Sequence, residues 1–289
     1  MSKTVIIFGH GYVSKFLIQQ LNAFGCVVYC TSRKVDIGRP VKNENVTIIN
    51  FLDPSLISLI KSSNVLLSTV PPNNEIIDPV LDEYADIISK GIFEWIGYLS
   101  STSVYGDHHG AWVDEETKCA PSNEKSRIRL LAEQQWLELY SKNKLPVHVL
   151  RLSGIYGPNR NCLKQIKNGK DFTIIKKDQF FSRIHVEDIC MAIIASIKSP
   201  TAGEIYNVSD DEPAPINIVQ QFGASILNAN SLKEIPFEVS TLSDQTKFFF
   251  NDNKKVSNKK IMKKLNIKWI YPNYLVGLTK GCLPDLSNT

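Results

Sequence analysis

Short apolar runs alternate with amphipathic stretches along the first half of the chain. The runs are apolar at consecutive positions, which is typical of strands that are buried on both faces of a parallel sheet. The expected strands are residues 5–8, 26–30, 46–49, 65–68, 95–100 and 147–150, and the expected helices lie near 12–22, 54–61, 75–90 and 123–142. This alternation predicts an α/β fold with a doubly wound parallel sheet of the Rossmann type.

The alternation ends after about residue 152, where segments shorten and Gly and Pro become frequent. Residues 182–185 and 204–208 are expected strands on either side of a helix at 186–198. A chain of 289 residues is long enough for about two domains. We therefore expect a Rossmann domain over residues 1–152 and a smaller C-terminal domain over residues 153–289, with segments of the latter returning to the first.

Composition excludes several classes of protein. The 33 Lys and Arg residues against 29 Asp and Glu give a net charge of +4, which is too small to indicate a nucleic-acid partner. No run approaches the roughly 18 uncharged apolar residues that span a bilayer, and the N-terminus lacks a signal-peptide pattern. The six cysteines form no C-x-x-C pair and are expected to be free thiols of a cytoplasmic protein.

A basic run near the C-terminus is expected on a helix. We interpret it as a solvated helix face rather than a nucleic-acid surface. Its members are Lys254, Lys255, Lys259, Lys260, Lys263 and Lys264.

The first expected strand runs into a glycine turn and then a helix, the order that dinucleotide binding requires. Gly9 permits the tight turn, and Gly11 lets the backbone approach a pyrophosphate. The helix N-terminus, at Tyr12 and Val13, offers amide N–H groups and a partial positive charge. Ser14 stands where a third glycine is usual, and its side chain is small. We expect Gly9, Gly11, Tyr12 and Val13 to bind a dinucleotide.

The end of the second strand favours NADP over NAD. An NAD-selective site usually has Asp or Glu there, to hold the ribose 2′-hydroxyl. Here Ser32, Arg33 and Lys34 occupy this place, and Asp36 comes only after the cations. A guanidinium such as that of Arg33 makes forked, charge-assisted contacts with a phosphate. We expect Arg33, supported by Ser32 or Lys34, to select NADP, with NAD as the alternative.

Five further segments carry a resemblance to one family. Residues 99–106 resemble the S-S-x-x-V-Y-G strand end of extended short-chain dehydrogenases, and residues 151–158 resemble their R-x-x-x-x-Y-G-P turn. Residues 181–189 are similar to an F-x-x-I-H-V-x-D segment, and residues 203–208 and 269–278 fit as well. The family is the NAD(P)-dependent epimerase/dehydratase group, and the short glycine turn resembles its atypical branch.

This resemblance implies an NAD(P)-binding domain, a substrate domain and a cleft where the nicotinamide meets a small-molecule substrate. It also implies that Ser101 holds a substrate oxygen, and that a homodimer forms through the helices near 75–90 and 123–142. The apolar stripes of these two helices are equally consistent with packing against the sheet.

The family's catalytic Y-x-x-x-K pair is missing. In the family the lysine lies four residues before the glutamate of an A-E pair, which is Ala132-Glu133 here. Lys125 therefore stands at the tyrosine position and Arg129 at the lysine position. Arginine stays protonated, so Arg129 can bind a ribose or a substrate anion but cannot transfer a proton. A lysine acts as an acid or base only where burial or neighbouring cations, here Arg127 and Arg129, lower its pKa.

Other groups are weaker candidates for chemistry. By position, Tyr105, Tyr156 and His185 are replacement proton donors, although each is more typical of packing. The loop at 106–121 contains adjacent His108 and His109 and several acids, but this spacing is not that of a metal site. We interpret the loop as a lid over the substrate or an ordinary surface loop, and we expect no metal.

Two functions remain open from the sequence. The first is an NADP-dependent, epimerase/dehydratase-like oxidoreductase that acts on a small polar, sugar-like metabolite. The second is a non-catalytic NADP(H)-binding redox sensor or regulatory protein, which the missing tyrosine favours. A fold of this kind hosts either function.

Overall fold

The computed structural model describes residues 3–43, 46–241, 247 and 249–283. These residues form two compact, interleaved units. The first unit takes residues 1–101, 124–151 and 189–206, and the second takes residues 102–123, 152–188 and 207–289. We expect residues 1–152 to bind the cofactor and residues 153–289 to bind the substrate. These two roles stay predictions.

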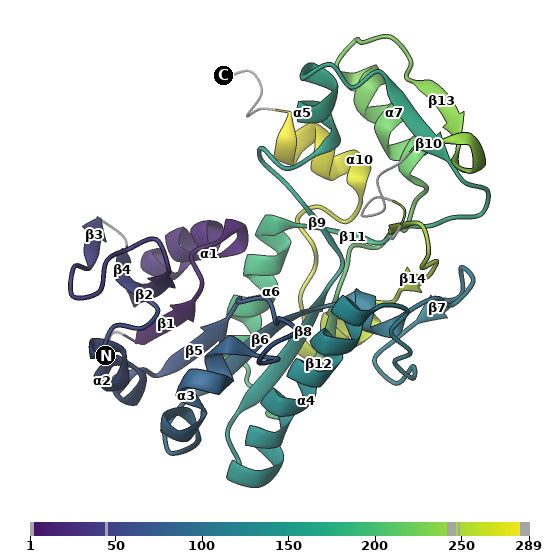
Figure 1. The fold of residues 1–289 in the computed structure, drawn as a ribbon. Helices are drawn as coiled ribbons and strands as arrows, with labels where there is room; N and C mark the ends of the chain where they lie inside the picture. Colours follow the sequence, from purple (N-terminus) through teal and green to yellow (C-terminus); the bar gives the residue numbers. More distant parts are fainter. Residues whose placement is uncertain (1–2, 44–45, 242–246, 248, 284–289) are drawn as a thin grey trace. The chain divides into compact units, whose positions relative to one another are not determined.

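The first unit is built on an 8-stranded sheet with the strand order β12-β8-β6-β5-β1-β2-β4-β3 (Figure 1). Its strands are β1 (Thr4–Phe8), β2 (Val27–Ser32), β3 (Val41–Asn43), β4 (Val46–Asn50), β5 (Val65–Ser68), β6 (Trp95–Ser101), β8 (Val147–Leu152) and β12 (Ile205–Val208). Strand β1 pairs in parallel with both β2 and β5, and β3 is an antiparallel edge strand. The predicted α/β fold with a large, mostly parallel sheet is confirmed.

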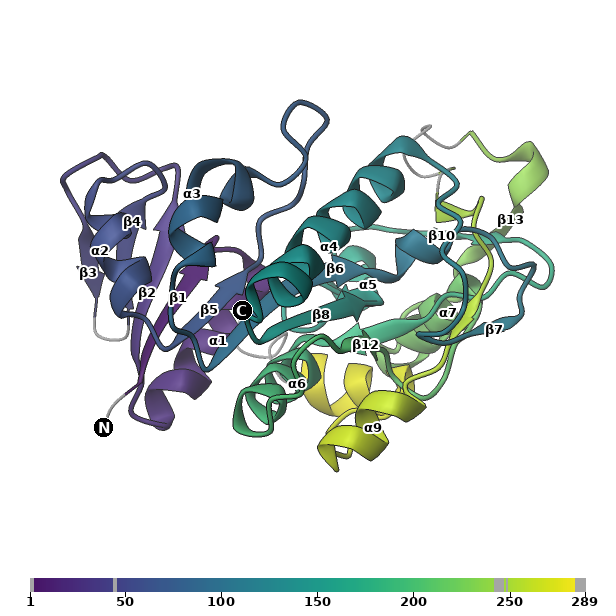
Figure 2. The same cartoon turned by 90° about the horizontal axis from the view of Figure 1, so that it is seen from below.

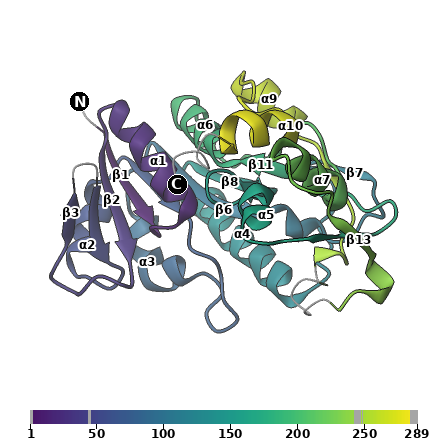
Figure 3. The same ribbon diagram turned by 90° about the horizontal axis from the view of Figure 1, so that it is seen from above.

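Helices cover both faces of this sheet. Helices α2 (Ser55–Ser62), α3 (Pro79–Ser89) and α4 (Glu124–Asn143) lie on one face (Figure 2), and α1 (Tyr12–Ala23) and α6 (Val186–Lys198) lie on the other (Figure 3). Every predicted helix of this unit forms, with ends that shift by a few residues. The largest shift is at α3, which begins at Pro79 because the Asp78 carboxylate accepts the N–H groups of Val80 and Leu81 at 2.9 and 3.0 Å.

The core of the first unit lies between the sheet and α2, α3 and α4. Buried apolar side chains of β1, β5, β6 and these three helices form one cluster. Trp136 of α4 is fully buried, stacks on Tyr98, and donates from Nε1 to Asp78 Oδ2 at 2.8 Å. One buried carboxylate therefore both begins α3 and holds α4 beside it.

The second unit contains short elements around its own apolar cluster, which includes Tyr156, Leu163, Val219 and Leu278. Its strands are β7 (Trp112–Val113), β9 (Gly154–Tyr156), β10 (Phe172–Ile175), β11 (Arg183–His185), β13 (Lys233–Pro236) and β14 (Lys255–Val256). Its helices are α5 (Cys162–Lys167), α7 (Ile216–Ile226), α9 (Lys259–Leu265), α10 (Tyr274–Val276) and the short turns η1 (Thr102–Tyr105), η2 (Phe237–Val239) and η3 (Gly277–Cys282). Strand β11 was expected; the other strands of this unit were not.

No helix within the described ranges is long and apolar enough to cross a membrane. All six cysteines are free thiols.

Candidate functional site

The turn after β1 is the first part of the site, and its backbone requires glycine at position 9. Gly9 has a φ of +102°, and a Cβ atom there would lie 2.5 Å from Thr69 Oγ1. This conformation is strained for any residue with a side chain. Gly9 therefore performs the role that the sequence indicates, a tight turn between β1 and α1.

Hydroxyl groups from three segments hold this turn. Ser14 Oγ donates to Gly9 O at 2.8 Å, and Gly9 N–H donates to Thr31 Oγ1 at 3.1 Å. Thr69 Oγ1, just after β5, donates to Phe8 O at 3.0 Å. Ser14 is fully buried. Ser14, in place of the usual third glycine, is small enough for this position, and its hydroxyl also ties the turn to α1.

Gly11 precedes α1 under quite different conditions. Its φ is −94°, which any residue can adopt, and among the described residues no atom beyond its two chain neighbours lies within 4 Å of a Cβ built on it. The fold does not need glycine here. A Cβ at this point would obstruct only a ligand that binds in front of α1. The first turn of α1 contains no acidic residue, and no side chain caps it, so its N-terminus suits an anion such as a pyrophosphate.

His10, between the two glycines, is half-buried. Partial burial, and then the charge of Lys15, lower its pKa. It is therefore a neutral side chain at pH 7 in this turn.

The carboxyl end of β2 presents cations and no acid. Arg33 and Lys34 are exposed, and their side chains form no hydrogen bond or ion pair with any residue that the structure describes. Ser32 Oγ accepts the N–H of Lys34 at 3.2 Å, so its own hydrogen can still be donated. These three residues fit an additional phosphate on the adenosine ribose, and they lack the carboxylate that a 2′-hydroxyl would need.

The end of β6 places Ser101 beside a buried polar triad. Ser101 is the last residue of β6 and is half-buried. The preceding Ser100 donates to Glu133 of α4. Glu133 in turn accepts two N–H groups of Arg151, with Nη2 at 2.8 Å from Oε2. The A-E glutamate of the family pattern therefore ties β6, α4 and β8 together, and it fixes the helix that carries Lys125 and Arg129.

Lys125 and Arg129 share one side of α4 but lie in different surroundings. Lys125 is exposed in the first turn, whereas Arg129 is half-buried and donates from Nη1 to Leu99 O at 3.2 Å. Arg127 forms a two-point ion pair with Glu124, at 2.7 and 2.5 Å. Because Glu124 compensates the charge of Arg127, the cationic cluster that would activate Lys125 is reduced to Arg129.

The three candidate replacement proton donors are buried in the second unit, where each contacts another residue. Tyr105 is fully buried and donates to Asn207 Oδ1 at 2.8 Å. The Tyr156 hydroxyl donates to Asn273 O at 3.3 Å, and burial raises its pKa far above the usual range. His185 packs on Tyr271, with ring centroids 4.0 Å apart, and burial lowers its pKa to about 4. These surroundings indicate structural roles.

The loop at 106–121 is held by the backbone of Asn253, whose carbonyl accepts the N–H groups of His108 and Gly110 at 3.0 and 2.9 Å. Over the described part of the chain, no group of three or more His, Cys, Asp or Glu side chains is arranged to hold a metal ion.

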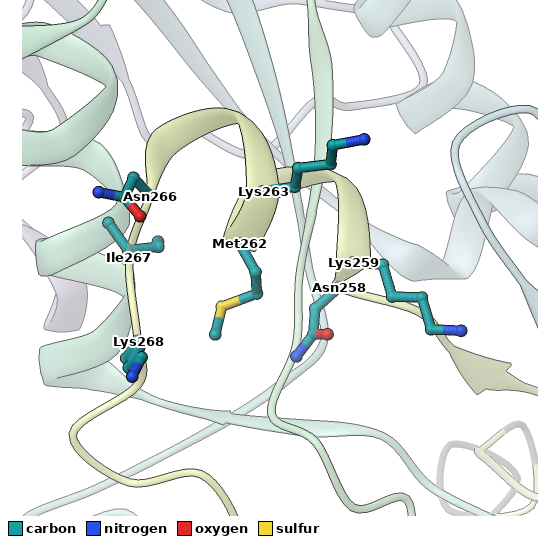
Figure 4. A pocket seen from close by; sticks show the side chains of 7 residues that line it. All are labelled: Asn258, Lys259, Met262, Lys263, Asn266, Ile267 and Lys268. Carbon is teal, nitrogen blue, oxygen red and sulfur yellow. The ribbon is translucent and has the colours of Figure 1, made fainter.

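The basic run does not lie on one helix, and this expectation was wrong. Helix α9 begins only at Lys259. Lys254, before it, is largely buried and donates to Gly106 O at 2.9 Å, and Lys255 lies over the Phe180 ring at 4.3 Å. A shallow depression borders α9, but Met262 points into it while Lys259 and Lys263 extend away from it (Figure 4). The lysines do not converge on a common anion.

Comparison with known proteins adds the family. The sequence model of the NAD dependent epimerase/dehydratase family matches residues 88–209. A solved structure of a functionally unknown conserved protein from Silicibacter pomeroyi DSS is 38% identical, with a TM-score of 0.86 over 96% of this chain and 97% of that one. The chain belongs to the NAD-dependent epimerase/dehydratase family.

Two more distant matches also extend over nearly the whole chain. Protein YeeZ of Escherichia coli K12 is 26% identical over 289 residues, which cover 95% of this chain and 98% of YeeZ. The dTDP-glucose 4,6-dehydratase of Bacillus anthracis, solved in complex with NAD, is 17% identical, with a TM-score of 0.79 over 97% of this chain and 95% of that one. At that identity the dehydratase shares the fold. The family name specifies NAD, so the comparisons do not support the preference for NADP that the end of β2 predicts.

The residues that hold the Gly9 turn were not identified from the sequence. Thr31 and Thr69 are separated from Gly9 by 22 and 60 residues along the chain. The only signal in the sequence was a hydroxyl side chain at or just after a strand end on each side of β1.

Proposed function

We propose that this family member is an NADP-binding oxidoreductase of the epimerase/dehydratase type that acts on a small polar, sugar-like metabolite. The observation that carries the proposal is the open space over Gly11, in a turn that the protein braces from three sides. The uncapped N-terminus of α1 and the free space at Gly11 support an anion bound in front of this helix.

Each predicted residue has a role in this proposal. Gly9, Gly11, Tyr12 and Val13 hold the pyrophosphate, and Ser32, Arg33 and Lys34 receive a ribose 2′-phosphate. When bound, the nicotinamide accepts or donates a hydride. Ser101 orients a substrate hydroxyl or carbonyl, and Arg129 binds the ribose or a substrate anion. Lys125 is the remaining candidate for proton transfer at the substrate oxygen.

Cofactor titration tests the proposal. Wild type should bind NADPH more tightly than NADH, and Arg33→Ala should lose about ten- to a hundredfold in NADPH affinity, the value of a charge-assisted contact. Lys61→Ala, which removes an exposed lysine from α2, is the control for the loss of one charge. Equal wild-type affinity for NADH and NADPH would contradict the NADP assignment.

A second candidate function is a non-catalytic NADP(H)-binding sensor or regulator. The supporting observation is that α4 carries an exposed lysine and a half-buried arginine where the family has tyrosine and lysine. A panel of sugars, ketones and alcohols separates the two functions. Binding of NADPH without any turnover over the panel would favour the sensor.

Two further expectations belong to the same proposal. The six free thiols support a reducing, cytoplasmic location. A homodimer through α3 and α4 is proposed from the family resemblance, and light scattering on the purified chain tests it.

A further inference from the structure

The loop after β2 carries more positive charge than cofactor selection by Arg33 alone requires. Residues 33–40 lead from β2 to β3 and include Arg33, Lys34 and Arg39 against one acid, Asp36. All of these side chains are exposed. Like Arg33 and Lys34, Arg39 forms no side-chain hydrogen bond or ion pair with a residue in the described part of the chain.

The end of strand β4 and the turn that follows it each hold this loop at one point. Asn50, the last residue of β4, donates from Nδ2 to Val35 O. Asp53 Oδ2 accepts the N–H of Gly38 at 2.6 Å, and Gly38 has a φ of +72°. The loop backbone on the N-terminal side of Arg39 is therefore fixed from outside the loop.

Asp53 is suited to this task. It is 6% exposed, and its Oδ1 accepts the N–H and the hydroxyl of Ser55 at 3.0 and 2.6 Å. The hydrogen bond from the Ser55 hydroxyl, followed by those from backbone N–H groups, lowers the pKa of Asp53. The carboxylate is thus ionised at neutral pH, and its two oxygens serve different partners: one begins α2 and the other holds Gly38.

We propose that Arg39 is a second specificity-determining residue for the ribose 2′-phosphate, and that Asp53 is the positioning residue that sets the loop for it. This inference rests on the proposed NADP binding. A phosphate monoester carries about −1.5 to −2 charges at pH 7, so a single guanidinium leaves it partly uncompensated. Arg33 and Arg39 from one pre-fixed loop match this charge. A loop that is already ordered also loses less entropy on binding.

The test compares ligands that differ only in the 2′-phosphate: NADPH against NADH, and 2′,5′-ADP against ADP. Arg39→Ala should raise the dissociation constants of NADPH and 2′,5′-ADP about tenfold, and leave those of NADH and ADP within about twofold. Asp53→Asn should reduce the NADPH/NADH affinity ratio about three- to tenfold, because an amide has one acceptor oxygen and cannot hold both Ser55 and Gly38.

Ser55→Ala is the matched control, because it removes a hydrogen bond from the same carboxylate but leaves Gly38 held. It should keep the wild-type affinity ratio. A merely structural role for Asp53 would weaken all four ligands equally in Asp53→Asn. If wild type discriminates but Arg39→Ala and Asp53→Asn keep its ratio, the inference is wrong and the proposed function stands. If wild type does not discriminate, the proposed cofactor itself is wrong.

Discussion

Gly9 and Gly11 stand two residues apart in one turn, yet different constraints act on them. Gly9 is required by its own backbone and by the closeness of Thr69, so the constraint comes from the protein. At Gly11 neither the backbone nor any neighbouring atom requires glycine. This contrast supports the proposal that a ligand approaches the backbone at Gly11.

This contrast yields a paired prediction. Gly9→Ala should lower the free energy of unfolding by about 1–3 kcal/mol, because it forces a positive φ on alanine and displaces Thr69. Gly11→Ala should leave stability within about 0.5 kcal/mol and weaken binding of NADPH at least tenfold. Urea denaturation and fluorescence titration measure the two effects. Unchanged affinity in Gly11→Ala and in the bulkier Gly11→Val would remove the argument for a cofactor at this turn.

Ser101 and Lys125 can be separated by kinetics once a substrate is found. Lys125→Met should reduce kcat by about 10²–10⁴, the usual contribution of a positioned acid or base, and leave NADPH affinity unchanged. Ser101→Ala should reduce kcat/KM through loss of a substrate contact. Lys142→Met, an exposed lysine at the other end of α4, is the control. Full turnover in Lys125→Met would place the proton donor elsewhere.

At the scale of elements, the sheet and α4 are joined through charge as well as through apolar packing. Glu133 is 1% exposed and Arg151 is 4% exposed, and together with Ser100 they link the ends of β6 and β8 to the helix. A buried ion pair of this kind adds little net stability compared with apolar residues, but a single partner left alone is costly. The triad therefore sets the register of α4 on the sheet and, with it, the placement of Arg129 near the end of β6.

Breaking the triad should be measurable as stability. Arg151→Met should lower the free energy of unfolding by about 3–5 kcal/mol, because it leaves the Glu133 carboxylate buried without its cation. Glu124→Gln, which removes an exposed ion pair from the same helix, should cost less than about 1 kcal/mol. Equal effects of the two variants in urea denaturation would show that Glu133 does not depend on Arg151.

For the whole molecule, the buried side chain of His148 predicts how stability responds to acid. His148 is fully buried, and its Nε2 accepts the N–H of Thr201 at 2.8 Å. A backbone N–H can only donate, so Nε2 carries no hydrogen and Nδ1 donates to Ile96 O at 3.3 Å. Burial lowers the pKa of His148 from 6.5 to about 4. Protonation would break the bond to Thr201 and place a charge in the core.

The sign of the pH effect follows from this shift. The unfolded chain takes up a proton at His148 near pH 6.5, whereas the folded chain does so only near pH 4. The stability contributed by neutral His148 is therefore complete above pH 6.5 and is lost as the pH falls towards 4, by about 3 kcal/mol in total. His148→Phe should flatten the slope of unfolding free energy over this range. An unaltered slope in His148→Phe would contradict the assignment.

The sequence by itself determined the order of strands and helices in the first unit apart from the edge strand β3, the glycine turn, the cations after β2 and the family. Each of these depends on neighbours along the chain: a run of apolar residues, a glycine after a strand, or a motif of about eight residues. Such local patterns can be recognised without knowing which residues pack against them. By contrast, the short strands β7, β9 and β14 of the second unit could not be predicted, because pairing alone makes them strands.

Only the tertiary structure decided which residues act on the site from a distance. The hydroxyls of Thr31 and Thr69 hold the Gly9 turn, and Asp53 holds the loop that carries Arg39. The hydroxyls of Tyr105 and Tyr156 donate hydrogen bonds within the second unit. These partners lie tens of residues apart in the chain. Their contacts arise when parallel strands bring their carboxyl ends to one edge of the sheet or when buried polar groups must find a partner, and no local pattern in the sequence records either event.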